Sequence, residues 1–278
     1  MSATTMTATA PGQARPRAVT VSPVSLPAVS RSEWIKFRTL RSSWIVLAAT
    51  VVAVIGIGML VSYFTNTHWS SMRPAERFRF NAVDRSLTGV NLAQLTIGVL
   101  GVLFVSGEYG TGMIRATLSA APTRIPVLVA KAAVFAVVTF VSSIVATVVA
   151  FATGQGLLGP HGVGWGTPGA VRAVFGAALY LTVVGLLGVA LGFLVRSTAG
   201  GIGALFGLLL VLPVIFAALP SSWNNTVGPY LPNNAGGALW NLRGNGFQLS
   251  PWVGFAVFCA WAAAGLILAA FLLRRRDA

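Results

Sequence analysis

Charged residues are scarce in this sequence, and acidic residues are the scarcest of all. Lys, Arg, Asp and Glu make up 9% of the 278 residues, whereas soluble domains carry roughly 25%. Only five residues are acidic, while hydrophobic residues reach 55% and the mean hydropathy is +0.80. This composition excludes an ordinary soluble domain and predicts a polytopic membrane protein.

Several chemical motifs are missing as well. The two lysines, Lys36 and Lys131, do not follow a glycine-rich loop, so the chain has no P-loop to hold nucleotide phosphates. His68 and His161 fall in predicted outer loops, and no span carries an acid or histidine at its centre, which disfavours a proton-coupled carrier. Cys259 stands alone and cannot form an intramolecular disulfide. We predict no enzyme activity, no metal site and no cofactor of its own for this chain.

The net charge of +14 comes from basic residues that flank apolar runs. Such a distribution favours membrane orientation over nucleic-acid binding, because Lys and Arg accumulate on the cytoplasmic side. With the N-terminus inside, 13 basic residues lie in the cytoplasm and six outside. The inner set is Arg15, Arg17, Arg31, Lys36, Arg38, Arg41, Arg115, Arg124, Lys131, Arg196 and Arg274 to Arg276; the outer set is Arg73, Arg77, Arg79, Arg85, Arg172 and Arg243. We predict a multi-pass protein of the cell membrane with both termini in the cytoplasm.

Six apolar runs are long enough to cross a bilayer, which needs about 20 helical residues. They cover residues 44–64, 87–106, 127–153, 173–195, 199–219 and 251–273. Their length and lack of alternation exclude a β-barrel and predict an all-α fold. We expect a tight hairpin at 196–198, a bend at Pro213, and short re-entrant or interfacial pieces within 220–250.

The residues before the first span divide into two segments. Residues 1–30, rich in Ala, Thr, Ser and Pro, are predicted to be a disordered cytosolic tail. Trp34, Phe37 and Leu40 recur every three residues among basic ones, which predicts an amphipathic interfacial helix over 31–43. The alternative is a plain basic flank of the first span. The six-helix membrane domain would then occupy 44–278.

Two further patterns lie inside the spans. Asn91, Gln94 and Thr96 form the most polar group within a span; they either make hydrogen bonds between helices or line a substrate path. Pairs of glycines four residues apart, Gly188/Gly192 and Gly203/Gly207, could permit close helix contact.

A polar stretch, SGEYGTGMIRATLSAAPTR at 106–124, separates two apolar runs. Its glycines disfavour a continuous helix, so the second span is expected to end near Gly107. Thr111 is then expected to cap a short helix over 112–121, which ends before Pro122.

That short helix would carry an apolar ridge of Met113, Ile114 and Leu118, with Glu108 and Arg115 fixing its orientation. The distribution of Lys and Arg places it in the cytosol. A short helix with an apolar ridge is suited to a partner's groove, so we predict a docking element, the coupling helix.

These residues, in this order, resemble the membrane subunits of type 2 ABC exporters. The shared features are a glutamate, a Gly-Thr-rich turn, an arginine, a Pro-x-Arg and a lysine that opens the third span: Glu108, Gly110 to Gly112, Arg115, Pro122, Arg124 and Lys131. The amphipathic helix at 31–41, the six spans and YLPNNAGGAL at 230–239 extend the resemblance over residues 31–278. The arginine-rich first outer loop is not a feature of this resemblance.

The resemblance implies a permease that exports a hydrophobic or amphipathic substrate such as a drug, peptide or lipid. It also implies a separate cytosolic ABC subunit that binds ATP and Mg²⁺, and a second permease copy, identical or different, that completes the path. The partner-binding residues would be Glu108, Thr111, Gly112, Met113, Ile114, Arg115, Leu118, Pro122 and Arg124. The remaining alternatives are a secondary carrier and a non-transporting membrane partner or immunity protein.

Overall fold

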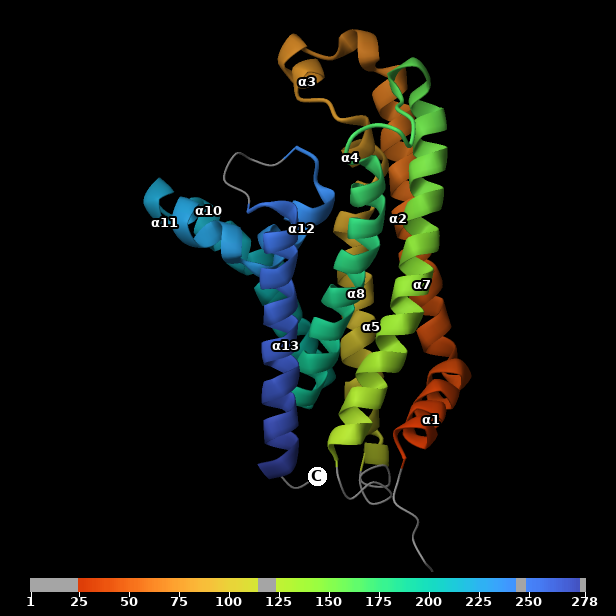
Figure 1. Ribbon diagram of the computed structural model, residues 1–278, viewed down its shortest axis with the longest axis vertical. Helices are drawn as coiled ribbons and strands as arrows, with labels where there is room; N and C mark the ends of the chain where they lie inside the picture. The colour runs from red at the N-terminus through yellow and green to blue at the C-terminus, as the bar shows by residue number, and fades with distance from the viewer. Residues whose placement is uncertain (1–24, 115–123, 244–248, 276–278) are drawn as a thin grey trace, which may run out of the picture.

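The protein is a bundle of long helices, described by a computed structural model for residues 25–114, 124–243 and 249–275 (Figure 1). Within these ranges every regular element is helical and no strand occurs, which confirms the predicted all-α fold. Three residues of the predicted coupling helix lie outside the described residues: Arg115, Leu118 and Pro122.

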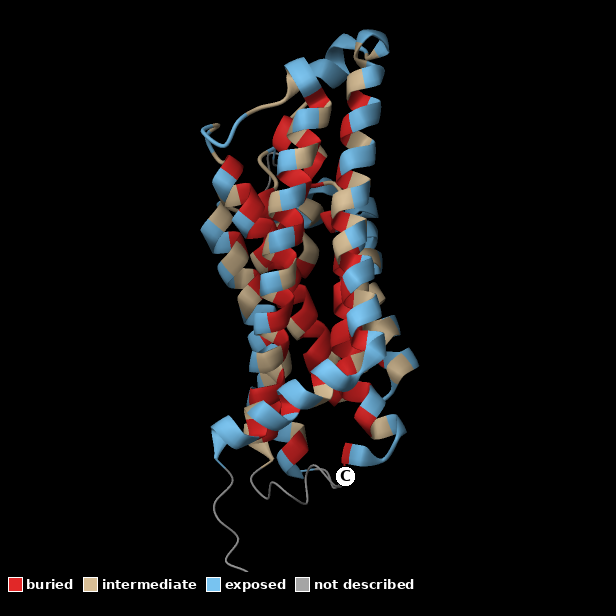
Figure 2. Cartoon of the chain, turned by 90° about the vertical axis from the view of Figure 1, so that its right-hand side faces the viewer, coloured by how far each residue is buried: buried red, intermediate tan, exposed pale blue. Residues whose placement is uncertain are grey.

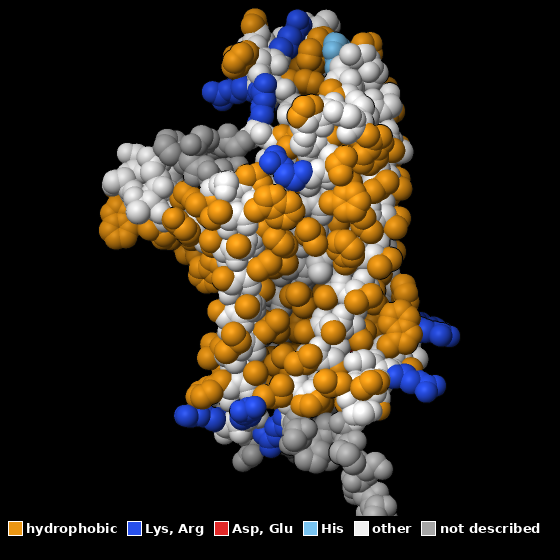
Figure 3. Space-filling view, viewed as in Figure 1, with side chains coloured by type: hydrophobic (Ala, Val, Ile, Leu, Met, Phe, Trp, Pro, Cys, Tyr) orange, Lys and Arg blue, Asp and Glu red, His pale blue; other side chains and the backbone are white. Residues whose placement is uncertain are grey.

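All six predicted spans are present as apolar helices. They are α2 (Arg41–Thr67), α5 (Val90–Gly110), α7 (Ile125–Leu158), α8 (Ala170–Val195), the run from Thr198 to Ala218, and α13 (Pro251–Arg275). Figure 3 shows hydrophobic side chains over the middle of the molecule and Lys and Arg side chains toward its two ends. A bilayer would produce this distribution, because charged groups are costly within hydrocarbon.

The helix before the first span differs from its predicted bounds. Helix α1 (Leu26–Thr39) starts within the segment assigned to the tail, and Pro27 occupies its first turn, where a missing N–H is harmless. Leu40 has an extended backbone and separates α1 from α2. Of the three predicted apolar residues, Phe37 is fully buried, while Trp34 and Leu40 are exposed.

The buried face of α1 follows a spacing of four and not the predicted spacing of three. Its members are Val29, Glu33 and Phe37, and they pack against α7. A spacing of four keeps side chains on one face of a 3.6-residue helix, whereas a strict spacing of three drifts around it. The predicted spacing was wrong because it considered only apolar residues, whereas the charged Glu33 also lies on the buried face.

The centre of the bundle is the pair α5 and α8, which are the two most deeply buried of the six spans. Figure 2 shows buried residues concentrated inside the bundle and exposed residues on its outside. A Cβ atom added at Gly188 would lie 2.2 Å from the carbonyl oxygen of Gly98, so the two backbones touch there. Gly192 also contacts α5, whereas Gly203 and Gly207 have open space around them. Only the first predicted glycine pair therefore mediates helix contact.

The fifth span is interrupted near Pro213. Helix α9 (Thr198–Phe206) continues into a π-helical turn, η3 (Gly207–Val211), and then into α10 (Leu212–Ala218). Proline has no N–H and its ring crowds the carbonyl four residues earlier, so the wider turn accommodates it. Figure 1 shows α10 leading away from the bundle, as the predicted bend requires.

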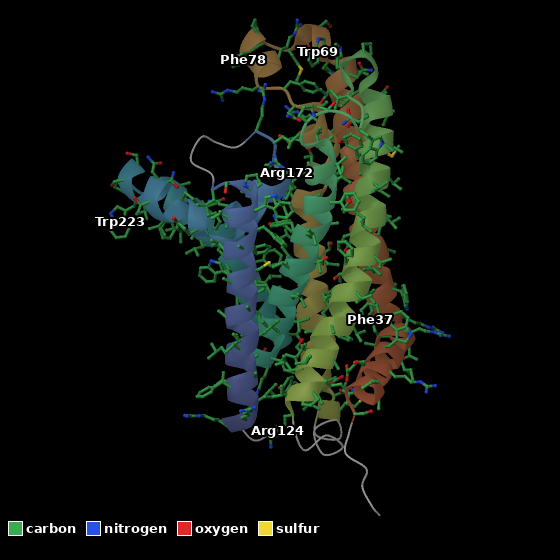
Figure 4. All side chains as sticks on the ribbon, in the orientation of Figure 1. Phe37, Trp69, Phe78, Arg124, Arg172 and Trp223 are labelled. Atoms are coloured by element: carbon green, nitrogen blue, oxygen red, sulfur yellow. The ribbon has the colours of Figure 1, made fainter. Side chains whose placement is uncertain are left out.

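Short helices fill the long link to the last span. They are α11 (Ser221–Val227), η4 (Gly228–Tyr230) and α12 (Pro232–Trp240), and α12 is buried against α8 and α13. At the same end of the molecule, η1 (Trp69–Ser71), α3 (Pro74–Phe78), α4 (Ala82–Ser86) and η2 (Gly159–His161) form a cap. The Trp69 and His161 rings stack with centroids 3.7 Å apart. Figure 4 marks Trp69 and Phe78 in this cap.

Candidate functional site

Four charged side chains from three helices meet inside the bundle, where α5 ends and α7 begins. Lys131 Nζ lies 2.5 Å from Glu33 Oε2 and 2.8 Å from Glu108 Oε1. Lys36 Nζ lies 2.8 Å from Glu33 Oε1 and 3.1 Å from Glu108 Oε1. Two lysines thus share two carboxylates, and the formal charge of this charge cluster is zero.

Helical spacing brings the four groups together. Glu33 and Phe37 are four residues apart and share the face of α1 that packs on α7. Lys131 lies on the buried face of α7, and its ammonium group is 4.3 Å from the ring centroid of Phe104. Figure 4 shows Phe37 where α1 meets α7. Aromatic rings therefore close the cluster on one side.

Burial makes the pairing of these charges obligatory. The Lys131 side chain is 0% exposed and that of Glu33 is 1% exposed. A buried charge without a partner is strongly unfavourable, and removal of one partner from a buried pair is far more damaging than replacement of both. Burial alone would lower the pKa of Lys36, but the carboxylates of Glu33 and Glu108 outweigh it and raise that pKa. Lys36 therefore stays charged at neutral pH.

The hairpin between α8 and α9 contacts the same end of α5. The Ser106 and Thr198 hydroxyls are hydrogen-bonded at 2.8 Å, and the Arg196 guanidinium lies 5.4 Å from the ring centroid of Tyr109. Arg196 has φ 56°, a left-handed conformation that ends α8 and turns the chain within two residues. The tight hairpin predicted at 196–198 is confirmed.

Arg124 connects the start of α7 to the last helix. Its Nη1 donates a hydrogen bond of 2.8 Å to the carbonyl oxygen of Leu273, close to the end of α13. A cation at a helix C-terminus satisfies a carbonyl and complements the helix dipole. Figure 4 places Arg124 beside the lower end of α13. The residues that flank 115–123 thus contact α1, α13 and the α8–α9 hairpin.

The predicted polar stretch differs from expectation at its start. Helix α5 continues to Gly110, three residues beyond the predicted end, and the Thr111 hydroxyl donates to the carbonyl of Gly107. Thr111 therefore closes α5 and does not begin the next helix. Gly112 has φ +71°, which only glycine adopts without strain, and a helical turn begins at Met113.

The predicted apolar ridge is divided between two environments. Met113 is 47% exposed, whereas Ile114 is 4% exposed and belongs to the core of the bundle. Ile114 therefore lies in the core and not on an exposed ridge, while its role in partner binding stays a prediction. Glu108, which was predicted to help fix the orientation of the short helix, is bound by Lys36 and Lys131.

The polar residues of the second span have separate partners. The Tyr180 hydroxyl is hydrogen-bonded to the side-chain oxygens of Gln94 and Asn233, which joins α5, α8 and α12. Thr96 is hydrogen-bonded to Thr50 at 2.8 Å, and the Asn91 side chain donates to the carbonyl of Thr88, in the turn before α5. Of the two readings for this group, hydrogen bonding between helices holds for Gln94 and Thr96.

Sequence reasoning omitted Glu33 and Lys36 from the site and treated Lys131 only as the start of a span. The sequence did contain one indication of the cluster, which is the rarity of lysine and acidic residues. The chain has two lysines and five acids, and the cluster contains both lysines and two of the acids. Charges this scarce near the ends of apolar helices are best explained by mutual pairing. Within the described ranges no three His, Cys, Asp or Glu residues come close enough to hold a metal ion.

Comparison with known proteins gives one family. The family model described as ABC-2 family transporter protein matches residues 31–214, about two thirds of the chain. The match includes α1 from Arg31 onward and all four members of the charge cluster. The search of curated proteins found no significant match.

Proposed function

Because this chain belongs to the ABC-2 family of transporter proteins, we propose that it is the permease of an exporter whose ATP is hydrolysed on a separate subunit. That subunit docks on the cytosolic segment 108–124. The permease exports a hydrophobic or amphipathic substrate, such as a drug, peptide or lipid. A second permease copy completes the path.

The charge cluster is the observation that carries this proposal. Segment 108–124 begins at Glu108, which is a member of the cluster, and leads into α7, whose second turn carries Lys131. Glu33 and Lys36 add α1 to the same contact. A displacement of the segment by the ATP-binding subunit would therefore move α5, α7 and α1 together.

Buried ion pairs suit this role for an energetic reason. Lys131 has no exposed surface, so it cannot exchange its carboxylates for water while the bundle moves. The ion pairs therefore hold the ends of α1, α5 and α7 at fixed positions relative to one another. Arg124 and the hydrogen bond to Leu273 extend the connection to α13.

The outer part of the bundle supports the proposed assembly. In the most apolar part of the fifth span 17% of the residues are buried, and in that of α13 22% are buried, so most residues there are not covered by the rest of the chain. A second permease copy would cover part of these faces.

The test begins with the chain purified from its native membrane together with any ATP-binding subunit that stays bound. We expect the pair to hydrolyse ATP in proteoliposomes and the isolated chain to show neither ATP binding nor hydrolysis. Lys131→Met, assayed below its lowered unfolding temperature so that the bundle stays folded, should leave ATP hydrolysis in place but reduce transport per ATP. Lys131→Arg should retain more transport.

Two results would contradict the proposal. One is nucleotide hydrolysis by the isolated chain. The other is transport driven by an ion gradient without any ATP-binding subunit, which would favour the secondary carrier. A matched control is Arg38→Gln, which removes an exposed charge of α1 that makes no ion pair within the described residues.

A further inference from the structure

An open cavity lies between α1 and α7. Its volume is about 430 Å³. Helix α7 contributes one apolar wall, made of Ala133, Val134, Val137 and Val138. These positions follow the spacing that places side chains on one helical face. The wall is accessible from outside, since Val137 is 64% exposed.

The other wall, on α1, consists of Ser30, Arg31 and Trp34. These residues line the cavity almost entirely with apolar atoms, and they also carry a hydroxyl, a guanidinium and an indole N–H. Glu33, on the same helix, is turned into the bundle and bound by lysines, so it does not neutralise this wall. Among the described residues Arg31 has no carboxylate partner. The cavity is therefore apolar, and one of the residues that line it, Arg31, carries a positive charge.

We propose that this groove binds one anionic glycerophospholipid, with its phosphate at Arg31 and an acyl chain along Val134 and Val137. The charge and the donors match a phosphate, because a guanidinium binds phosphate oxygens through paired N–H groups. The apolar wall matches an acyl chain and has no use for a free anion. The exposed indole of Trp34 suits the boundary between headgroups and hydrocarbon.

The choice of leaflet rests on the proposed orientation. With α1 on the cytoplasmic side, the lipid comes from the inner leaflet, where anionic headgroups attract basic segments. The site itself does not depend on an ATP-binding subunit. Its failure would leave the transport proposal intact, and a failed transport assay would leave the lipid site intact.

Occupancy of the groove would stabilise the contact that holds the charge cluster. The lipid would touch α1 through Arg31 and α7 through Val137, and α1 delivers Glu33 to Lys131. A lipid that bridges the two helices binds only when α1 lies on α7. It therefore favours the folded arrangement in proportion to its occupancy.

The test uses the full-length chain purified in mild detergent. Native mass spectrometry and thermal unfolding are measured with phosphatidylglycerol, phosphatidylcholine or glycerol 3-phosphate added. We expect retained phosphatidylglycerol and a raised unfolding temperature, less effect from phosphatidylcholine, and none from glycerol 3-phosphate. An equal effect from glycerol 3-phosphate would reveal a simple anion site, and equal binding of phosphatidylcholine would reveal a neutral groove. Either result overturns the proposal.

Two variants locate the site. Arg31→Gln removes the charge and should weaken phosphatidylglycerol binding about tenfold, as loss of a charge-assisted hydrogen bond predicts. Val137→Trp fills the groove from an exposed position and should weaken binding of both phospholipids. The matched controls are Arg38→Gln, an exposed charge on the same helix, and Ile267→Trp, an exposed apolar position on α13. Losses of equal size in the controls would mean that lipid binds nonspecifically, which also overturns the proposal.

Discussion

At the scale of single residues, Lys131 shows how few charges are needed to determine the arrangement of several helices. It is fully buried, and its ammonium group is bound by carboxylates from two other helices. A lysine in such a place allows few alternative packings, because each of them must again supply two acids. Only five acids exist in the chain. The cluster therefore specifies which helix ends lie together.

Removal of the lysine charge should be severely destabilising. We expect Lys131→Met to lower the free energy of unfolding by about 3–5 kcal/mol, because Glu33 and Glu108 lose their central partner inside the bundle. Thermal or denaturant unfolding of the detergent-purified chain measures this. The double variant Lys131→Met with Glu33→Gln should be less destabilised than the sum of its parts. Strict additivity of the two changes would show that the two groups do not interact.

The sequence predicted part of this cluster, for a physical reason. Glu108 stood out because an acid, glycines and arginines interrupt an apolar background. Glu33 did not stand out, since it lies among Arg31, Lys36 and Arg38 and looked like part of a solvated surface. Which face of α1 is buried depends on the position of Lys131, and this contact across 98 residues leaves no local pattern.

At the scale of elements, the start of the 111–124 segment is divided between the bundle and the surface. Gly112, in a left-handed conformation, turns the chain away from α5. After it, Met113 is half exposed and Ile114 is buried. Two adjacent apolar residues thus have different roles, which hydrophobicity alone could not distinguish.

This difference gives a pair of variants with opposite readouts. Met113→Asp should weaken binding of the ATP-binding subunit about tenfold or more, which corresponds to loss of one buried side chain at the interface. The isolated permease should keep its unfolding temperature. Ile114→Asp should destabilise the permease itself, because it buries an unpaired charge. Co-purification and thermal unfolding separate the two effects.

Met113→Leu is the conservative control and should leave partner binding within a few-fold of the original. If Met113→Asp retained its partner as well as Met113→Leu does, the exposed turn would not be a docking surface. The contact with the ATP-binding subunit would then lie elsewhere on the cytosolic side.

The contact between α5 and α8 allows a second comparison of elements. Gly188→Ala would place a Cβ atom 2.2 Å from the Gly98 carbonyl oxygen, so the helices must separate. We expect a loss of about 1–3 kcal/mol in the free energy of unfolding, as for overpacked cores. The control Gly203→Ala meets nothing within 4 Å. It should be neutral or stabilising by up to about 1 kcal/mol, because alanine favours a helix over glycine.

The spacing of glycines in sequence did not separate these two sites. Both belong to pairs four residues apart, and both lie in apolar spans. Their difference arises only when α8 is packed between α5 and α7, while α9 keeps one face uncovered. Equal effects of the two alanine variants would contradict the close approach at Gly188.

At the scale of the whole molecule, the number of membrane helices follows from the length of the apolar runs, and the positions of the short helices depend on polar contacts. Six runs of sufficient length predicted six membrane helices, and all six are present. The short outer helices α3, α4 and α12 were not predicted individually, since five to nine residues carry too little periodicity. Their positions depend on contacts such as those of the Asp84 carboxylate, which accepts backbone N–H groups from Leu242 and Arg243.

The orientation of the bundle gives the final prediction. The described basic residues of the predicted inner set lie toward the end that contains the charge cluster, and those of the outer set toward the cap. Because Lys and Arg are retained on the cytoplasmic side, α1 should face the cytosol and the cap the exterior. Single cysteines introduced into a Cys259→Ser background at exposed positions report this. The chosen changes are Ser70→Cys, Asn225→Cys and Ser32→Cys.

An impermeant thiol reagent added to intact cells should label Ser70→Cys in the cap and Asn225→Cys in α11. Ser32→Cys on α1 should react only after the membrane is permeabilised. Labelling of Ser32→Cys in intact cells, with protection of the other two, would invert the bundle. Segment 108–124 would then face the exterior, beyond reach of any cytosolic ATP-binding subunit, so the same measurement decides whether docking at this segment is physically available.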